Sequence, residues 1–157
     1  MRKSIITQGP HSATPSIRNW LDLENQARAE LTSEEAAHPI ESALKPGVGS
    51  GWRASEPGRQ IIRLLFDTPL RVKRVHLVFR EEEQARTQEF LLRWSSDGGS
   101  AYRQIVRQQY TFSPPDNILE VEEYEVDLVG LTELEIAISP DISGGLARAS
   151  IAELRLA

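Results

Sequence analysis

The sequence contains no cysteine, which excludes disulfide bonds, thiolate zinc sites and thiol catalysis. Aromatic residues make up only 6% of its 157 residues. Basic residues are also in deficit, because 18 Lys and Arg stand against 23 Asp and Glu, for a net charge of −5. That balance argues against a dedicated nucleic-acid binder, which usually carries a basic excess. The length suits one domain, or one domain with a tail.

Long apolar runs are missing as well. The start of the chain has only Ile5 and Ile6 as adjacent apolar residues, too few for a signal peptide. No window approaches the roughly 18 apolar residues of a membrane span. We therefore expect a cytoplasmic location. The sequence also lacks a Gly-x-Ser-x-Gly motif, a phosphate loop and a zinc signature, so we expect a protein that is not an enzyme.

From residue 60 onward, apolar and polar residues alternate in short runs. Alternation with period two predicts strands with one packed side and one wet side. Turn residues separate several of these runs, at Asp67-Thr68-Pro69, at Gly98 and Gly99, and at Pro114 and Pro115, and residues 129–131 form a further loop. About seven short strands at this spacing predict an all-β jelly-roll sandwich. The apolar members are Ile62, Leu64, Phe66, Val75, Leu77, Phe79, Phe90, Leu92, Trp94, Tyr124, Val126, Leu128, Leu134, Ile136, Ile138, Ala152, Leu154 and Leu156, and the expected wet side includes Glu123, Glu125, Asp127, Glu133 and Glu135.

The first part of the chain is polar and irregular. We predict a short helical or irregular arm over residues 1–26 and a β-sandwich domain over residues 27–157. Residues 19–31 permit two interpretations: an amphipathic helix capped by Asn19, or a strand that enters the domain at Ala27. Residues 38–44, with Pro39 near their start, predict one helical turn.

Several short stretches together resemble a known family. These are Gly51-Trp52-Arg53-Ala54-Ser55, Phe66-Asp67-Thr68-Pro69, Trp94-Ser95-Ser96-Asp97-Gly98 and the closing Ala149-Ser150-Ile151-Ala152-Glu153-Leu154-Arg155-Leu156. Their order and spacing resemble the discoidin, or coagulation factor 5/8 type C, domains of the galactose-binding-like superfamily. The resemblance implies a binding module for sugars, phospholipid heads or proteins that is seldom catalytic. Fold-level analogy of this kind does not decide the ligand.

Alternating strand directions sort the loops into two ends of the sandwich. Residues 52–59, 81–87, 113–117 and 140–148 fall at the end that carries the ligand in the resembling family. Arginine forks and carboxylates both suit sugar hydroxyls, which donate and accept hydrogen bonds. We therefore predict ligand-binding roles for Arg53, Glu56, Arg59, Glu83 and Arg86. The alternative is a solvated charged loop, and in either case replacing Arg53 or Arg86 by Ala should leave folding intact.

Three further expectations concern ligands and partners. Residues 81–87 contain no aromatic or large apolar residue, and Glu81-Glu82-Glu83 would repel anionic lipid, so we expect no membrane binding. The resemblance implies a calcium ligand at Glu153, but residues 45–51 contain no Asp, and a neighbouring Arg or backbone N–H is the better partner. We expect no metal or other cofactor, and a monomer.

Three functions therefore compete. The first is a carbohydrate-binding module that uses loops at one end of the sandwich. The alternative is a protein-interaction or scaffold domain of a cytoplasmic complex, and an accessory subunit of an enzyme is a third. An exposed aromatic ring beside Arg and Glu in a concavity would favour sugar, whereas a flat polar end would favour protein.

Overall fold

In the computed structural model, which describes residues 20–45 and 50–157, two long bent strands organise the fold. They are β3 (Gln60–Arg80) and β6 (Leu119–Ser139), which pair antiparallel with each other on both sides of their bends. The register shifts between Leu65 and Leu70, where the sequence predicted a break between two strands. In β6 the bend includes Gly130, whose φ of +72° suits glycine. The strands predicted separately on either side of residues 67–69 are therefore halves of the continuous β3, and those on either side of residues 129–131 are halves of the continuous β6.

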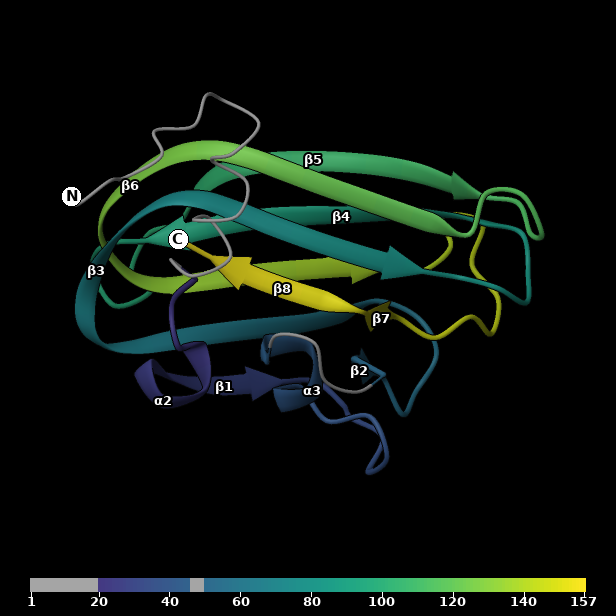
Figure 1. Ribbon diagram of the computed structural model, residues 1–157, viewed down its shortest axis with the longest axis horizontal. Coiled ribbons are helices and arrows are strands. Elements are labelled where there is room, and N and C mark those ends of the chain that lie inside the picture. The colour runs from purple at the N-terminus through teal and green to yellow at the C-terminus, as the bar shows by residue number, and fades with distance from the viewer. Residues whose placement is uncertain (1–19, 46–49) are drawn as a thin grey trace, which may run out of the picture.

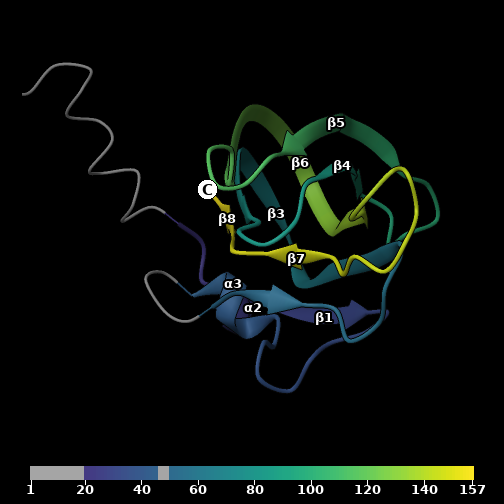
Figure 2. The same ribbon diagram turned by 90° about the vertical axis from the view of Figure 1, so that its right-hand side faces the viewer.

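Because both strands bend, each contributes to two layers (Figure 2). One layer holds the first part of β3 and the second part of β6, extended by β1 (Ala27–Leu31), β4 (Arg86–Ser95) and β5 (Arg103–Phe112). The other holds the remaining halves and β8 (Glu153–Leu156). A separate two-stranded ladder joins β2 (Trp52–Arg53) to β7 (Ser150–Ile151). This arrangement confirms the predicted all-β jelly-roll sandwich.

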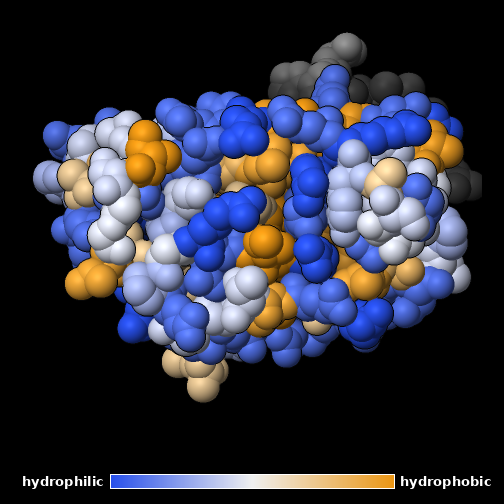
Figure 3. All heavy atoms as spheres, turned by 180° about the vertical axis from the view of Figure 1, so that it is seen from behind, coloured by the Kyte–Doolittle hydropathy of each residue, from blue (hydrophilic) through white to orange (hydrophobic). Residues whose placement is uncertain are grey.

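The core lies between the two layers and is built from the apolar members of the alternating runs. Leu64, Leu77, Phe79, Phe90 and Ile138 are all buried there. The outer sides of the strands carry both polar and apolar residues. Seen from behind the molecule, an apolar band runs between hydrophilic regions of the surface (Figure 3).

The prediction that Glu133 and Glu135 lie on a wet side is wrong, because β6 is central in its layer and its neighbours cover both carboxylates. Arg63 Nε donates to Glu135 Oε2 at 2.8 Å, and Arg93 binds the other oxygen of the same carboxylate. The Tyr102 hydroxyl donates to Glu133. Glu123, Glu125 and Asp127, on the half of β6 that precedes the bend, are exposed as predicted.

The N-terminal part combines both interpretations of residues 19–31. A four-residue helix, α2 (Leu23–Gln26), leads directly into β1. The Leu23 side chain is buried in the core, and Leu21 N donates to Leu156 O at 2.8 Å. The predicted arm therefore contributes to the sandwich from Leu21 onward, and its residues 1–19 lie outside the described residues. The predicted helical turn is present as α3 (Glu41–Leu44).

The loops sort as the sequence predicted. The connections after β2, β3, β5 and β6 lie at the right-hand end in Figure 1, and the bends of β3 and β6 lie at the left. None of the helices in residues 20–45 and 50–157 combines the length and the apolar character that a membrane span requires.

Candidate functional site

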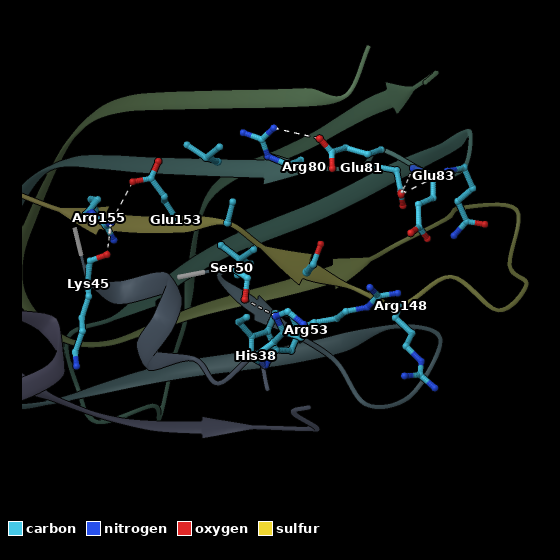
Figure 4. Close-up of a pocket in the computed structure, with 17 residues that line it drawn as sticks. His38, Lys45, Ser50, Arg53, Arg80, Glu81, Glu83, Arg148, Glu153 and Arg155 are labelled. Carbon is cyan, nitrogen blue, oxygen red and sulfur yellow. Dashed lines mark hydrogen bonds and ion pairs between the residues drawn. The ribbon is translucent and has the colours of Figure 1, made fainter. Parts of the chain in front are cut away.

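A hollow of about 540 Å³ opens beside β7, and we call it the β7 hollow (Figure 4). Its walls come from segments that are far apart in the sequence: the chain around α3, the strand β2, the β3–β4 connection, and the run from Arg148 through β7 into β8. The lining residues are His38, Lys45, Ser50, Trp52, Arg53, Val78, Arg80, Glu81, Glu82, Glu83, Gln84, Arg148, Ser150, Ile151, Ala152, Glu153 and Arg155.

Close backbone packing positions β2 against β7. Gly51 has a φ of +77°, and a Cβ at this position would lie 2.3 Å from Ile151 O. The following residue, Trp52, is fully buried, and its Nε1 donates to Ser33 O at 3.2 Å. With Trp52 directed inward, the next side chain on the strand, Arg53, points to the surface, because side chains alternate along a strand. The Gly-Trp-Arg motif therefore delivers Arg53 to the rim of the hollow.

The rim on the α3 side is basic. Arg148 Nη1 lies 2.9 Å from Glu35 Oε1, and Arg53 Nε lies 3.5 Å from the same oxygen. His38 Nε2 is 3.9 Å from the second oxygen of Glu35, and its Nδ1 is 2.6 Å from Ser50 Oγ. Two arginines thus share one carboxylate, which leaves positive charge and N–H donors at the hollow.

The opposite rim is acidic. Glu83 is exposed there, and among the described residues its carboxylate has no ion-pair partner. Neighbouring Glu82 lies 3.5 Å from Arg80 Nη1. Figure 4 shows Glu81 and Glu83 on one side of the hollow and Arg53, Arg148 and His38 on the other. The hollow therefore offers hydrogen-bond donors on one wall and an acceptor on the facing wall.

Arg86 was predicted on an exposed ligand loop, and this placement is wrong. It is the first residue of β4, and its side chain is only 1% exposed. Its guanidinium donates to Glu81 Oε1 at 2.6 Å and to Pro140 O at 2.6 Å, and lies 4.9 Å from the Phe112 ring centroid. Burial alone would raise the pKa of Glu81, but the hydrogen bonds from Arg86 and from the backbone N–H of Glu83 hold that pKa below its ordinary value. Arg86 is a structural residue that connects two of the loops at this end.

The other predicted residues are divided between different places. Arg53 and Glu83 line the β7 hollow. Arg59 borders a second, smaller hollow, and Glu56 is exposed on the β2–β3 connection but lines neither hollow. Sequence reasoning missed His38, Arg80 and Arg148. The sequence offered a signal for two of them: His38 begins the predicted helical turn, and Arg148 lies in a loop assigned to the ligand end.

Aromatic rings in this region are buried. Trp52 and Phe112 are both fully buried, and Trp94 is buried in the core. Among the described residues that line the β7 hollow, none is an exposed Trp, Tyr or Phe. The condition that would favour sugar is therefore met only in part. The end is concave and carries Arg and Glu, but no exposed aromatic ring from the described lining residues accompanies them.

The suggested calcium ligand Glu153 lies beside Arg155. Arg155 Nη2 is 3.0 Å from Glu153 Oε1 and donates to Lys45 O at 2.6 Å, and Nη1 donates to Ala43 O at 2.6 Å. The Arg155 guanidinium therefore occupies one oxygen of the Glu153 carboxylate. Within residues 20–45 and 50–157, no three His, Asp or Glu side chains form a metal-binding group.

No protein-family model matches the chain, and no curated protein does. Several solved structures, however, match the chain. The family 32 carbohydrate-binding module of Clostridium perfringens NanJ, solved with galactose, is 18% identical and aligns over 87% of this chain and 96% of its own, with a TM-score of 0.61. A chitosan-binding module of a Paenibacillus chitosanase/glucanase is 18% identical over 87% of this chain and 98% of its own, with a TM-score of 0.56.

A third similar structure is the XRCC1 N-terminal domain bound to the DNA polymerase beta catalytic domain. It is 18% identical and aligns over 84% of this chain and 96% of its own, with a TM-score of 0.58. Similarity at this level of identity shows a shared fold. It confirms the jelly-roll fold that the sequence resemblance implied.

Proposed function

We propose that the chain is a non-catalytic carbohydrate-binding module and that sugar binds in the β7 hollow. The observation that carries this proposal is the placement of Arg53 and Arg148 opposite Glu83 across one concavity. A sugar hydroxyl both donates and accepts a hydrogen bond, so a sugar site needs donors and acceptors within reach of the same ring. Arginine supplies donors only and a carboxylate supplies acceptors only, and the hollow presents Arg53 and Arg148 on one wall and Glu83 on the facing wall.

The similar structures support a sugar ligand. The NanJ module was solved with galactose, and the Paenibacillus module is described as chitosan-binding. Because the β7 hollow has no exposed aromatic ring among its described lining residues, we expect charge-assisted hydrogen bonds rather than ring stacking to supply most of the affinity.

Titration calorimetry and amide NMR shifts with a sugar panel would test the proposal. The panel contains galactose, N-acetylgalactosamine, GalNAc-β-1,3-galactose, chitosan oligosaccharides and pectin fragments. We expect at least one sugar to shift the amides of residues 52–53, 81–84 and 148–153, and Arg53→Ala to weaken its binding at least tenfold. Arg71→Ala is the matched control, because Arg71 is an exposed arginine paired with Asp127 beside the bend of β3, away from the hollow. If no sugar moves these amides, the proposal is wrong.

The second candidate is a protein-interaction domain. One observation favours it: the β6–β7 connection exposes two large apolar side chains, Leu146 at 86% and Ile142 at 50%. Apolar side chains that gather on a surface mark interaction sites. The XRCC1 domain, with the same fold, was solved bound to another protein. This alternative predicts no response to the sugar panel. It also predicts a stoichiometric partner in a pull-down from native lysate, lost with Leu146→Asp.

A further inference from the structure

The connection between β6 and β7 contributes to a second hollow of about 370 Å³, which we call the Ile142 hollow. Pro140, Ile142 and Ala147 give it an apolar lining, and Arg59, Glu89 and Asp141 bring charged groups to it. This mixture of apolar and charged lining suits a sugar, because a pyranose ring presents C–H groups on its faces and hydroxyls around its edge. Apolar lining suits the C–H groups, and arginine and carboxylates suit the hydroxyls.

The two hollows adjoin along the chain. Ala147 lines the Ile142 hollow, and the next residue, Arg148, lines the β7 hollow. Gly58, which lines the Ile142 hollow, forms a backbone bridge with Arg148, which lines the β7 hollow, and Gly58 N donates to Ala147 O at 3.2 Å. Gly58 has no side chain, and a Cβ there would meet nothing within 4 Å. The boundary at Gly58 is therefore bare backbone with open space above it.

The connection itself is held in shape. Ile142 N donates to Thr87 O at 2.8 Å, and Ser143 N donates to Asp141 Oδ1 at 3.0 Å. Yet this connection exposes two large apolar side chains, Ile142 at 50% and Leu146 at 86%. A fixed loop with exposed apolar side chains is preorganised to bind, because little conformational entropy is lost when a ligand covers it.

We propose that the β7 hollow and the Ile142 hollow are consecutive subsites for one linear oligosaccharide that crosses the bridge at Gly58. This inference rests on the proposed carbohydrate-binding function and adds the class of sugar: an internal stretch of a chain rather than a terminal monosaccharide. The β7 hollow holds one part of the chain through Arg53 and Arg148. The Ile142 hollow holds the next part against Ile142, with Arg59 donating to its hydroxyls.

Calorimetric titration with three oligosaccharide series would test the inference. The probes are oligogalacturonides, chitosan oligosaccharides and β-1,4-galacto-oligosaccharides, each with one, two, four and six sugar units. We expect one series to bind with an affinity that rises at least tenfold between two and six units. The double variant Arg59→Ala/Ile142→Ser should lose this gain while keeping the affinity for one and two units. Arg53→Ala should weaken every length, and the Arg71→Ala control should resemble the unmodified protein.

The outcomes separate this inference from the function on which it rests. Binding of short sugars without a gain in length, or a gain that the double variant retains, overturns the two-subsite inference and leaves the carbohydrate-binding proposal standing. Failure of all three series and of the earlier sugar panel overturns both. Both substituted side chains are at the surface, so an unchanged melting temperature of the double variant shows that any loss comes from binding and not from unfolding.

Discussion

Replacing Arg86 by Ala should destabilise the domain strongly, although Arg86 was predicted as a surface residue. The variant loses two charge-assisted hydrogen bonds of 2.6 Å, to Glu81 and to Pro140 O, at a side chain that is 1% exposed. Hydrogen bonds to charged groups contribute about 1.5–3 kcal/mol each. Glu81 keeps the backbone N–H of Glu83 at 3.0 Å, so its carboxylate is not left without a partner. We therefore expect a loss of about 3–4 kcal/mol, near the lower limit for breaking a buried ion pair.

Urea denaturation, monitored by tryptophan fluorescence, measures this loss as a lower urea concentration at the midpoint of unfolding. For a chain of this length, 1 kcal/mol corresponds to about 2–4 °C, so the melting temperature should fall by about 6–16 °C. Arg53→Ala is the control, since an exposed arginine should change stability by no more than about 0.5 kcal/mol. Arg86→Lys should lie between the two, because lysine keeps the charge without the fork that reaches both partners. A loss below about 1 kcal/mol for Arg86→Ala would refute the structural role given to this residue.

Three other predictions concern buried groups. Burial alone would raise the pKa of Glu135, but hydrogen bonds from Arg63 and Arg93 hold it below its ordinary value, so this carboxylate stabilises the fold above about pH 4.5 and the contribution is lost as the pH falls further. Glu135→Gln should cost about 2 kcal/mol at pH 7 in urea denaturation and flatten the acid limb of the stability profile. Burial, followed by the neighbouring Glu122, raises the pKa of Glu120 to about 9, so Glu120 should weaken the fold as the pH rises from about 4.5 to 9. Glu120→Gln should add at least about 1.4 kcal/mol at pH 8, and an unchanged pH profile would contradict the assignment. Gly51→Ala should cost about 3 kcal/mol or more, because a positive φ and a contact of 2.3 Å with Ile151 O combine, whereas Gly58→Ala has the positive φ without the contact and should cost about 1–2 kcal/mol.

Period-two alternation was enough to predict the all-β sandwich and, with alternating strand directions, the end at which each loop lies. Those directions sorted the loops correctly, and Arg53 and Glu83 do meet at one hollow. The alternation could not show that Glu135 is covered, because cover comes from Arg63 and Arg93 on neighbouring strands that are distant in sequence. Nor could it distinguish a break between strands from a bend within one, since both use the same turn residues.

Arg86 shows a second limit of the sequence. Its position after three glutamates and a glutamine is typical of an exposed loop, and only the three-dimensional structure brings Pro140 O and Phe112 to it. His38 and Arg148 illustrate the converse. Each is an unremarkable polar residue in its own segment, and they become neighbours only because Glu35 lies between them.

The ladder of β2 with β7 also has a consequence for the order of folding. Its two residue pairs, Trp52 with Ile151 and Arg53 with Ser150, join segments near opposite ends of the domain's sequence. Closing so long a loop is entropically costly, and contacts of this range form slowly. The β7 hollow cannot exist until that closure is made, so a chain that is still folding, or one cut before β7, has no site to offer. A ligand that contacts both Arg53 and Arg148 would bind only the closed form and would slow its opening, which makes resistance to proteolysis near β7 a direct measure of occupancy.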